Sequence, residues 1–179
     1  MQMENKKFIG YEYKEVHTDR SKVDLMQDGY ECFGWELLEV KKIGPSKVSR
    51  MQSMYIKMRR DRKIINKMEL TRLQRNFEAC LKELELLEAA KTTKATIVAL
   101  IIGLLGTGFM TGSVLAVTAE PPKVLLSIFF AIPAFIGWTL PVFVYRHIVR
   151  KETEKYTPLI EAKYDEIYEI CEKGNKLLH

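Results

Sequence analysis

The sequence has few cysteines and histidines, and it contains no motif of a catalytic or cofactor-binding site. The three cysteines are widely spaced, odd in number and form no CxxC pair. This excludes a disulfide framework, gives no sign of a metal or redox site, and is typical of a reducing compartment. No P-loop, HExxH, nucleophile elbow or glycine-rich dinucleotide turn is present, so we expect no catalysis, no cofactor and no metal. The cysteines are Cys32, Cys80 and Cys171, and the isolated histidines are His17, His147 and His179.

The average composition resembles that of a soluble protein, but it is distributed unevenly. The 179 residues include 28 basic and 23 acidic side chains, a net charge of +5, and 47% hydrophobic residues. Such a length allows one ordinary domain, or a small domain with something added. The hydrophobic content excludes a disordered or collagen-like chain.

Two long segments carry no charge at all. Residues 95–119 form an uncharged run of 25 residues, and residues 124–145 form another of 22. Each exceeds the roughly 20 residues that a helix needs to cross about 30 Å of hydrocarbon. The alternative is a pair of buried helices in a soluble core, but a chain this short could not surround two helices that are apolar on every side. The runs therefore predict an integral membrane hairpin with a turn at 120–123, and neither lies where a cleaved signal peptide would.

Basic residues flank the outer ends of this hairpin and are scarce in its turn. Only Lys123 is basic in the turn, beside Glu120. The positive-inside bias therefore predicts cytoplasmic N- and C-termini in an inner (plasma) membrane, with the turn outside. The flanking basic residues are Lys91, Lys94, Arg146, Arg150, Lys151 and Lys155.

The N-terminal third has the pattern of a compact α+β unit. Alternating and β-branched residues predict strands at 8–16, 35–43 and 48–58. Apolar residues at three- and four-residue spacing predict a short helix between the first two strands, with Gly34 ending it in a left-handed conformation. Gly44-Pro45-Ser46 predicts a turn, so the expected order is βαββ.

Three short motifs in this region resemble those of a small, uncharacterised bacterial domain family. They are YEYK at 11–14, GWEL at 34–37 and YIKMR at 55–59. The resemblance covers about residues 8–60 and implies a βαββ fold, with no activity attached to it. One position differs, because Glu31 stands where the family often has a second glycine.

Two charged helices are expected to flank the membrane hairpin on the cytoplasmic side. Apolar stripes at heptad spacing run along 62–94 and 146–179, and Pro158 predicts a restart or bend in the second helix. Antiparallel pairing of the stripes would bury both, within one chain or between subunits. The predicted class is thus α+β, with a domain at 1–61 followed by an antiparallel coiled coil and a two-helix transmembrane hairpin. The stripes are Leu70, Leu73, Phe77, Cys80, Leu84 and Leu87, and Ile160, Tyr164, Ile167 and Cys171.

Positive charge is concentrated between residues 41 and 75. This segment has twelve basic and two acidic residues, a net charge of +10. One interpretation is an anion-binding face for nucleic acid, a phosphorylated ligand, acidic lipid or an acidic protein. The other is a solvated face, partly neutralised by the acidic C-terminal helix. The candidate anion-binding residues are Lys57, Arg59, Arg60, Arg62 and Lys63.

The first uncharged run carries hydroxyl groups and glycines on neighbouring faces. The hydroxyl face predicts a pore lining in a homo-oligomer, with an acidic ring at the outer mouth. A GxxxG pair predicts close helix packing, which also explains small residues without any pore. The candidate pore residues are Thr107, Thr111, Thr118 and Glu120, and the packing glycines are Gly108 and Gly112.

The sequence thus favours a non-enzymatic membrane protein that presents a cytoplasmic binding or regulatory module on a coiled-coil stalk. Its expected partners are the lipid bilayer and further copies of itself. A homo-oligomeric channel and a membrane-tethered nucleic-acid or phosphate sensor remain the alternatives.

Overall fold

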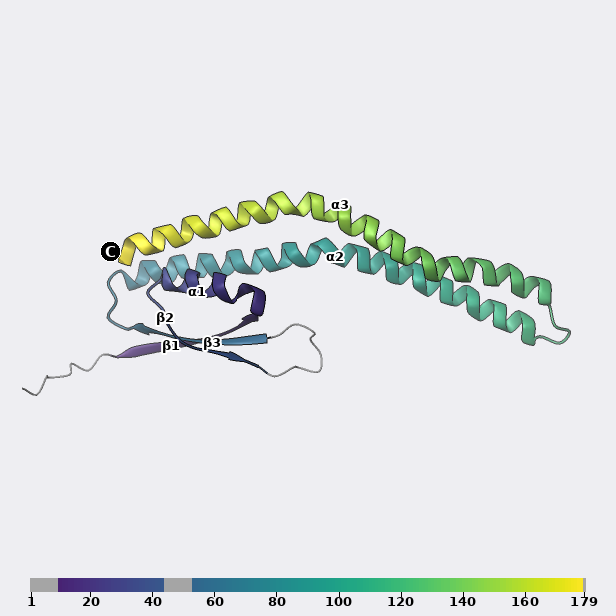
Figure 1. Ribbon diagram of the computed structural model, residues 1–179, viewed down its shortest axis with the longest axis horizontal. Helices are drawn as coiled ribbons and strands as arrows, with labels where there is room; N and C mark the ends of the chain where they lie inside the picture. The colour runs from purple at the N-terminus through teal and green to yellow at the C-terminus, as the bar shows by residue number, and fades with distance from the viewer. Residues whose placement is uncertain (1–9, 44–52, 179) are drawn as a thin grey trace, which may run out of the picture. The chain divides into compact units, whose positions relative to one another are not determined.

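The computed structural model describes residues 10–43 and 53–178, and they form an α+β structure with the predicted βαββ order (Figure 1). A three-stranded antiparallel sheet precedes two long helices. The elements are β1 (Tyr11–Asp19), a 3₁₀ turn (Arg20–Lys22), α1 (Val23–Glu31), β2 (Glu36–Lys42), β3 (Ser53–Asp61), α2 (Lys67–Thr118) and α3 (Val124–Leu178).

The first and third strands lie further along the chain than the sequence pattern predicts. β1 continues to Asp19 because Thr18 and Asp19 remain paired with Met54 and Ser53 of β3. Thr18 and Asp19 are therefore extended, and Asp19, which precedes the 3₁₀ turn, makes no side-chain cap bond. The predicted turn at 44–46 lies outside the described residues.

β3 is the central strand of the sheet, in the order β1-β3-β2. β1 and β2 both run antiparallel to it, so they are parallel to each other and are joined by α1. A register shift between Leu37 and Glu39 leaves Leu38 as a bulge on β2. Successive strand residues point to opposite faces, so Ile56, Met58 and Arg60 share the inner face of β3.

The core lies between this inner face, α1 and the N-terminal turns of α2 (Figure 1). Phe77 of α2 is fully buried, and its ring lies 5.6 Å from Tyr30 and 5.5 Å from Phe33. Gly29 is required at this crossing, because a Cβ there would overlap the Phe77 ring. Part of the predicted heptad stripe therefore packs on α1.

Gly34 ends the first helix as predicted. Its φ of +80° is in the left-handed region, which glycine adopts without strain. The Gly34 amide donates to the Glu31 carbonyl, and the Trp35 amide donates to the Tyr30 carbonyl. These two bonds form a Schellman motif, which turns the chain from α1 into β2.

The chain divides into two compact units. The first comprises residues up to Lys82 together with Lys163–His179, and the second comprises Glu83–Ala162. Within the first unit, Asn66 donates to the Leu177 carbonyl, so the start of α2 lies beside the end of α3. The first unit thus includes the sheet, α1 and the terminal turns of both long helices.

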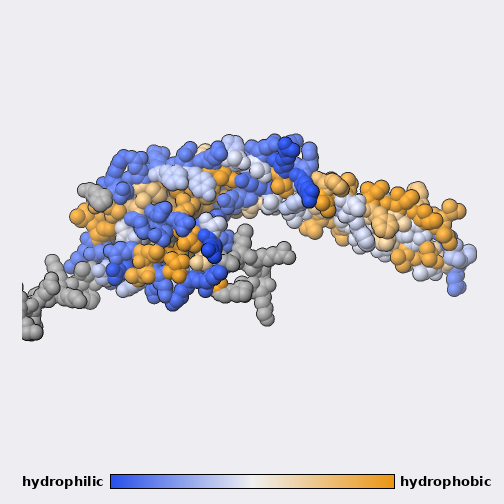
Figure 2. Space-filling view, viewed as in Figure 1, coloured by the Kyte–Doolittle hydropathy of each residue, from blue (hydrophilic) through white to orange (hydrophobic). Residues whose placement is uncertain are grey.

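The second unit is a pair of antiparallel helical segments joined by residues 119–123. Each contains a window long and apolar enough, by length and composition, to cross a membrane. Hydrophobic residues cover much of the surface beside the connecting loop (Figure 2). The two backbones meet at Gly106 and Gly137, where a Cβ on Gly137 would lie 2.7 Å from the Gly106 Cα.

α3 continues as one helix through Pro133, Pro141 and Pro158. Of the two alternatives predicted at Pro158, a restart or a bend, the restart is therefore wrong. Thr157 does not act as a cap, because its hydroxyl donates to the Thr153 carbonyl one turn earlier, at 2.8 Å.

Candidate functional site

Two adjacent arginines of the predicted anion-binding segment occupy opposite faces of β3. Arg59 lies on the outer face, where its Nε donates to Glu36 at 2.8 Å and its guanidinium stacks on Tyr11. Arg60 lies on the inner face, and only 4% of the residue is exposed. Strand alternation thus separates two residues that the sequence placed in one site.

Arg60 is the centre of a buried polar network. Its Nε donates to Glu12 at 2.6 Å, and a second nitrogen lies 3.3 Å from the Phe33 carbonyl. The guanidinium stacks over Trp35 with 4.6 Å between its carbon and the ring centroid. Lys67 also donates to Glu12, at 2.8 Å. Burial raises the pKa of Glu12, but the hydrogen bonds from Lys67 and Arg60 outweigh it and lower the pKa below its usual value.

Glu78 gathers a second group of polar side chains beside the first. Its Oε1 accepts hydrogen bonds from Lys14, from the Tyr30 hydroxyl at 3.0 Å and from Gln74 at 2.8 Å. Burial raises the pKa of Glu78, but the bonds from Lys14 and Gln74 reverse that effect and lower it. Burial and Glu78 raise the pKa of Tyr30 well above its usual value. Gln74 also accepts from the Trp35 indole at 2.8 Å, which links the two groups.

The remaining candidate cations have different surroundings. Lys57 lies 3.6 Å from Glu15 across the outer face of the sheet. Arg62 and Lys63 are exposed after the end of β3, and neither forms an ion pair with a described residue. Lys47 and Arg50, also counted in the basic segment, lie outside the described residues.

Two described cations of the basic segment, Lys67 and Arg72, pair with residues other than those of the C-terminal helix. Lys67 pairs with Glu12 of β1, and Arg72 pairs with Glu69 on its own helix. Three acidic residues near the C-terminal end of α3 pair with lysines of α3, since side chains three or four residues apart are neighbours on a helix. Those pairs are Lys163–Glu166, Lys173–Glu169 and Lys176–Glu172.

The outer face of the sheet has no helix or strand of the first unit's described residues packed on it (Figure 1). Tyr13 is 61% exposed there, and the rings of His17 and Tyr55 lie 5.6 Å apart. A hydrogen bond to Glu15 and partial desolvation raise the pKa of Tyr55 to about 12. Aromatic and charged side chains thus share an uncovered face, which is a surface suited to a partner.

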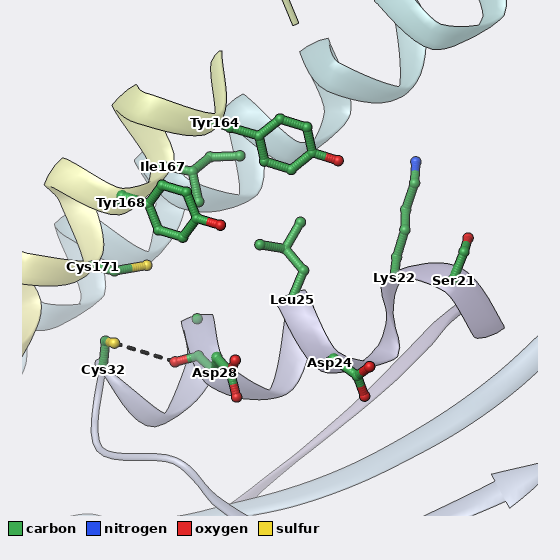
Figure 3. Close-up of a pocket in the computed structure, with 11 residues that line it drawn as sticks. Ser21, Lys22, Asp24, Leu25, Asp28, Cys32, Tyr164, Ile167, Tyr168 and Cys171 are labelled. Carbon is green, nitrogen blue, oxygen red and sulfur yellow. Dashed lines mark hydrogen bonds between the residues drawn. The ribbon is translucent and has the colours of Figure 1, made fainter. Parts of the chain in front are cut away.

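A groove of about 370 Å³ lies between α1 and the C-terminal turns of α3 (Figure 3). Leu25 and Ile167 provide apolar walls, and Asp28, Cys32 and Cys171 lie at one end. Gly174 closes this end, because a Cβ there would lie 2.7 Å from the Cys32 carbonyl oxygen. The groove brings together two cysteines that are far apart in the sequence.

The candidate pore hydroxyls are bonded to their own helix. Thr107, Thr111 and Thr118 donate to carbonyls one turn earlier, at 3.0, 3.0 and 3.1 Å. All three are exposed in the single chain, as is Glu120 in the turn. Because these hydroxyls have acceptors, the threonines do not require a water-filled pore to satisfy them.

The two glycines of the GxxxG pair are not at the closest approach of the helices in the hairpin. A Cβ on Gly108 would meet no atom within 4 Å, and one on Gly112 would make ordinary contact with Phe130. The hairpin packs instead through Gly106 and Gly137. It also packs through Ser113, whose hydroxyl lies 2.9 Å from the Ser127 carbonyl and hydroxyl. The Gly108 face remains available to another helix.

An ion pair lies next to the start of the first uncharged run. Lys94 donates to Glu152 at 2.7 Å, and the Glu152 side chain is only 9% exposed. The hydrogen bond and the charge of Glu152 raise the pKa of Lys94, and Lys94 lowers that of Glu152. This pair was missed from the sequence, although charges at the ends of uncharged runs were the available signal.

Comparison of the chain with protein-family models, curated proteins and solved structures finds no match. The βαββ order agrees with the family resemblance of residues 8–60, but membership of that family stays a prediction. The two units define the class of protein, a small α+β domain with a helical hairpin of membrane-spanning length. Function therefore has to be inferred from the geometry of this chain.

Proposed function

We propose that this protein is a two-span integral membrane protein that presents its α+β unit in the cytoplasm as a binding or regulatory module, without catalysis. The observation that carries the proposal is the exposed apolar surface of the hairpin. Twenty-one large hydrophobic side chains between Ile97 and Phe143 are more than a third exposed. In the most apolar windows of α2 and α3, only 11% and 17% of the residues are buried.

This exposure separates a membrane hairpin from the core helices of a soluble protein. A core helix would be mostly buried, whereas Leu104, Leu125 and Phe143 are 73%, 87% and 70% exposed. Removing each such side chain from water is worth about 1.5–3 kcal/mol. The exposed apolar patch of the hairpin is far larger than the patches found on soluble monomers, and a lipid bilayer would cover it.

The polar groups of the hairpin also suit a hydrocarbon environment. Polar atoms within a bilayer have to be satisfied inside the protein. Ser113 bonds to Ser127 across the hairpin, and Thr107 and Thr139 bond to carbonyls of their own helices. The ionisable groups Lys94 and Glu152 pair just outside the uncharged runs.

The binding role follows from the outer face of the sheet. A sheet with one covered face normally presents polar side chains to water on the other. Here Tyr11, Tyr13, His17 and Tyr55 lie on that face among charged side chains, and aromatic residues are enriched at binding surfaces. The partner class we favour is a protein, because Glu15, Glu36 and Glu39 lie on the same face and would repel nucleic acid.

Membrane insertion and orientation are testable together in bacterial cells expressing the chain. After carbonate extraction the protein should stay in the membrane fraction, and recovery in the soluble fraction would disprove the proposal. In a cysteine-free background, Lys123→Cys should react with a membrane-impermeant maleimide in intact cells. The matched variant Lys91→Cys should react only after permeabilisation, and the reverse pattern would invert the topology.

The binding face has its own test, which does not depend on orientation. Purified full-length protein with Tyr13→Ala and Tyr55→Ala should lose co-purifying or cross-linked partners from a membrane extract. The double variant Ile65→Ala and Met68→Ala also removes exposed apolar side chains but leaves the sheet intact. Equal loss in both double variants would show that the outer face is not the binding surface.

A further inference from the structure

The end of the groove between α1 and α3 holds two thiols, those of Cys32 and Cys171 (Figure 3). The Cys32 thiol donates to the Asp28 carbonyl, with 3.2 Å between sulfur and oxygen. Cys171, on the C-terminal turns of α3, lines the same end of the groove (Figure 3). The two cysteines therefore lie on opposite sides of the groove, one at the end of α1 and the other on α3.

We propose that Cys32 and Cys171 are a site of reversible oxidation, at which a hydroperoxide converts the two thiols into an intramolecular disulfide that ties α1 to the C-terminal turns of α3. The proposal lies within the first unit, to which both cysteines belong. It does not depend on the membrane proposal.

The surroundings favour this pair over the third cysteine. Cys32 and Cys171 line the groove and are partly exposed, so a small oxidant has access to them. Cys80 is buried, with 5% of the residue exposed. Gly174 lets the backbone of α3 approach the Cys32 carbonyl oxygen closely, three residues from Cys171.

The chemistry balances with one hydroperoxide for each disulfide. The Cys32 thiol loses its proton, and its sulfur attacks one peroxide oxygen while the O–O bond breaks. For hydrogen peroxide the products are a Cys32 sulfenic acid and water. The Cys171 sulfur then attacks the Cys32 sulfur, the S–S bond forms, and the hydroxyl leaves with the Cys171 proton as a second water. Two thiols are oxidised by two electrons, and the peroxide is reduced.

Both thiols have raised pKa values, so little of either is thiolate near neutral pH and oxidation is slow. Burial raises the pKa of Cys32, the Cys171 thiol partly offsets this, and Asp28 and Glu31 raise it further. Burial and the neighbouring Cys32 raise the pKa of Cys171 to about 12. Because the thiolate is the nucleophile, Cys32 is the sulfur that attacks first.

The test uses the full chain in detergent, treated with hydrogen peroxide and then labelled with a maleimide under denaturing conditions. Labelled thiols should fall from three to one per chain, with a Cys32–Cys171 peptide in the mass spectrum that dithiothreitol removes. The Cys80→Ser variant should form the same peptide. In Cys171→Ser, dimedone should instead trap a sulfenic acid on Cys32.

A second variant tests the geometry without removing a sulfur. Gly174→Ala should displace α3 from Cys32 and slow formation of the cross-linked peptide by on the order of tenfold or more. The proposal is overturned if wild-type protein keeps three labelled thiols. It is equally overturned if Cys32 reaches sulfinic acid without the cross-linked peptide, or if disulfides form only between chains.

Discussion

Replacing Arg60 with glutamine should destabilise the first unit strongly, whereas the same change at Arg59 should have little effect. Both residues are arginines of β3 with a carboxylate partner, so the pair is matched in chemistry and differs in burial. Arg60 bonds to Glu12 with 4% of its side chain exposed, while Arg59 bonds to Glu36 with 37% exposed. Arg60→Gln removes the buried charge and leaves Glu12 incompletely compensated.

The expected loss follows from the cost of breaking a buried ion pair, about 3–5 kcal/mol. Lys67 still donates to Glu12, and Lys67 is 37% exposed, so the lower end of that range applies. With a urea dependence of about 1–3 kcal/mol/M, a loss of about 3 kcal/mol lowers the unfolding midpoint by roughly 1–3 M. The Arg59→Gln midpoint should stay close to the wild type, because exposed ion pairs contribute little.

Trp35 fluorescence provides the assay, because the Arg60 guanidinium stacks on its ring. The second tryptophan is replaced in every variant by Trp138→Phe, so that only the first unit reports. The additional change Glu12→Gln should recover part of the midpoint lost in Arg60→Gln, since it removes the unpaired carboxylate. Equal midpoints for the Arg59 and Arg60 variants would refute the argument, and so would a further loss in the double variant.

Three further perturbations test other parts of the structure. Gly106→Leu should destabilise the hairpin by about 1–3 kcal/mol in an SDS titration, because its Cβ would lie 3.0 Å from the facing backbone; Gly108→Leu, with open space around it, should not. The pKa of Glu12 is lowered on folding, so its stabilisation is present above about 4.5 and is lost as the pH falls through the folded value. The melting temperature of wild type should therefore fall more than that of Glu12→Gln between pH 7 and about pH 3, and equal falls would contradict this. Oxidation of Cys32 and Cys171 should raise the melting temperature reversibly, with an upper limit of about 5 kcal/mol from loop closure; no change would show that the bond adds no constraint.

Local sequence patterns predicted much of the order of helices and strands, because each pattern reflects the backbone conformation that its own residues have to adopt. Gly34 was identified as the end of α1 because a left-handed residue is needed there. The strand boundaries were less accurate, since pairing with β3 extends β1 to Asp19 beyond its alternating pattern. The restart at Pro158 was predicted wrongly, because the helix tolerates the proline and continues.

The candidate site residues were harder to predict, because function depends on which face a side chain occupies and on what packs against it. Arg59 and Arg60 are indistinguishable as neighbours in a basic segment, yet one is on the surface and the other is buried over Trp35. Similarly, Gly106 and Gly108 are both small residues of one helix, and only Gly106 meets the facing backbone.

The sequence by itself determined the features that depend on composition and local spacing: the uncharged runs, the charge at their ends, the βαββ order and the stop at Gly34. Only the tertiary structure decided which separated residues meet. Three cysteines without a CxxC pair gave no sign of a redox site, whereas folding brings Cys32 and Cys171 to the same end of one groove. The physical reason is that contact between distant residues depends on how helices and strands pack, and no local pattern in the chain encodes that packing.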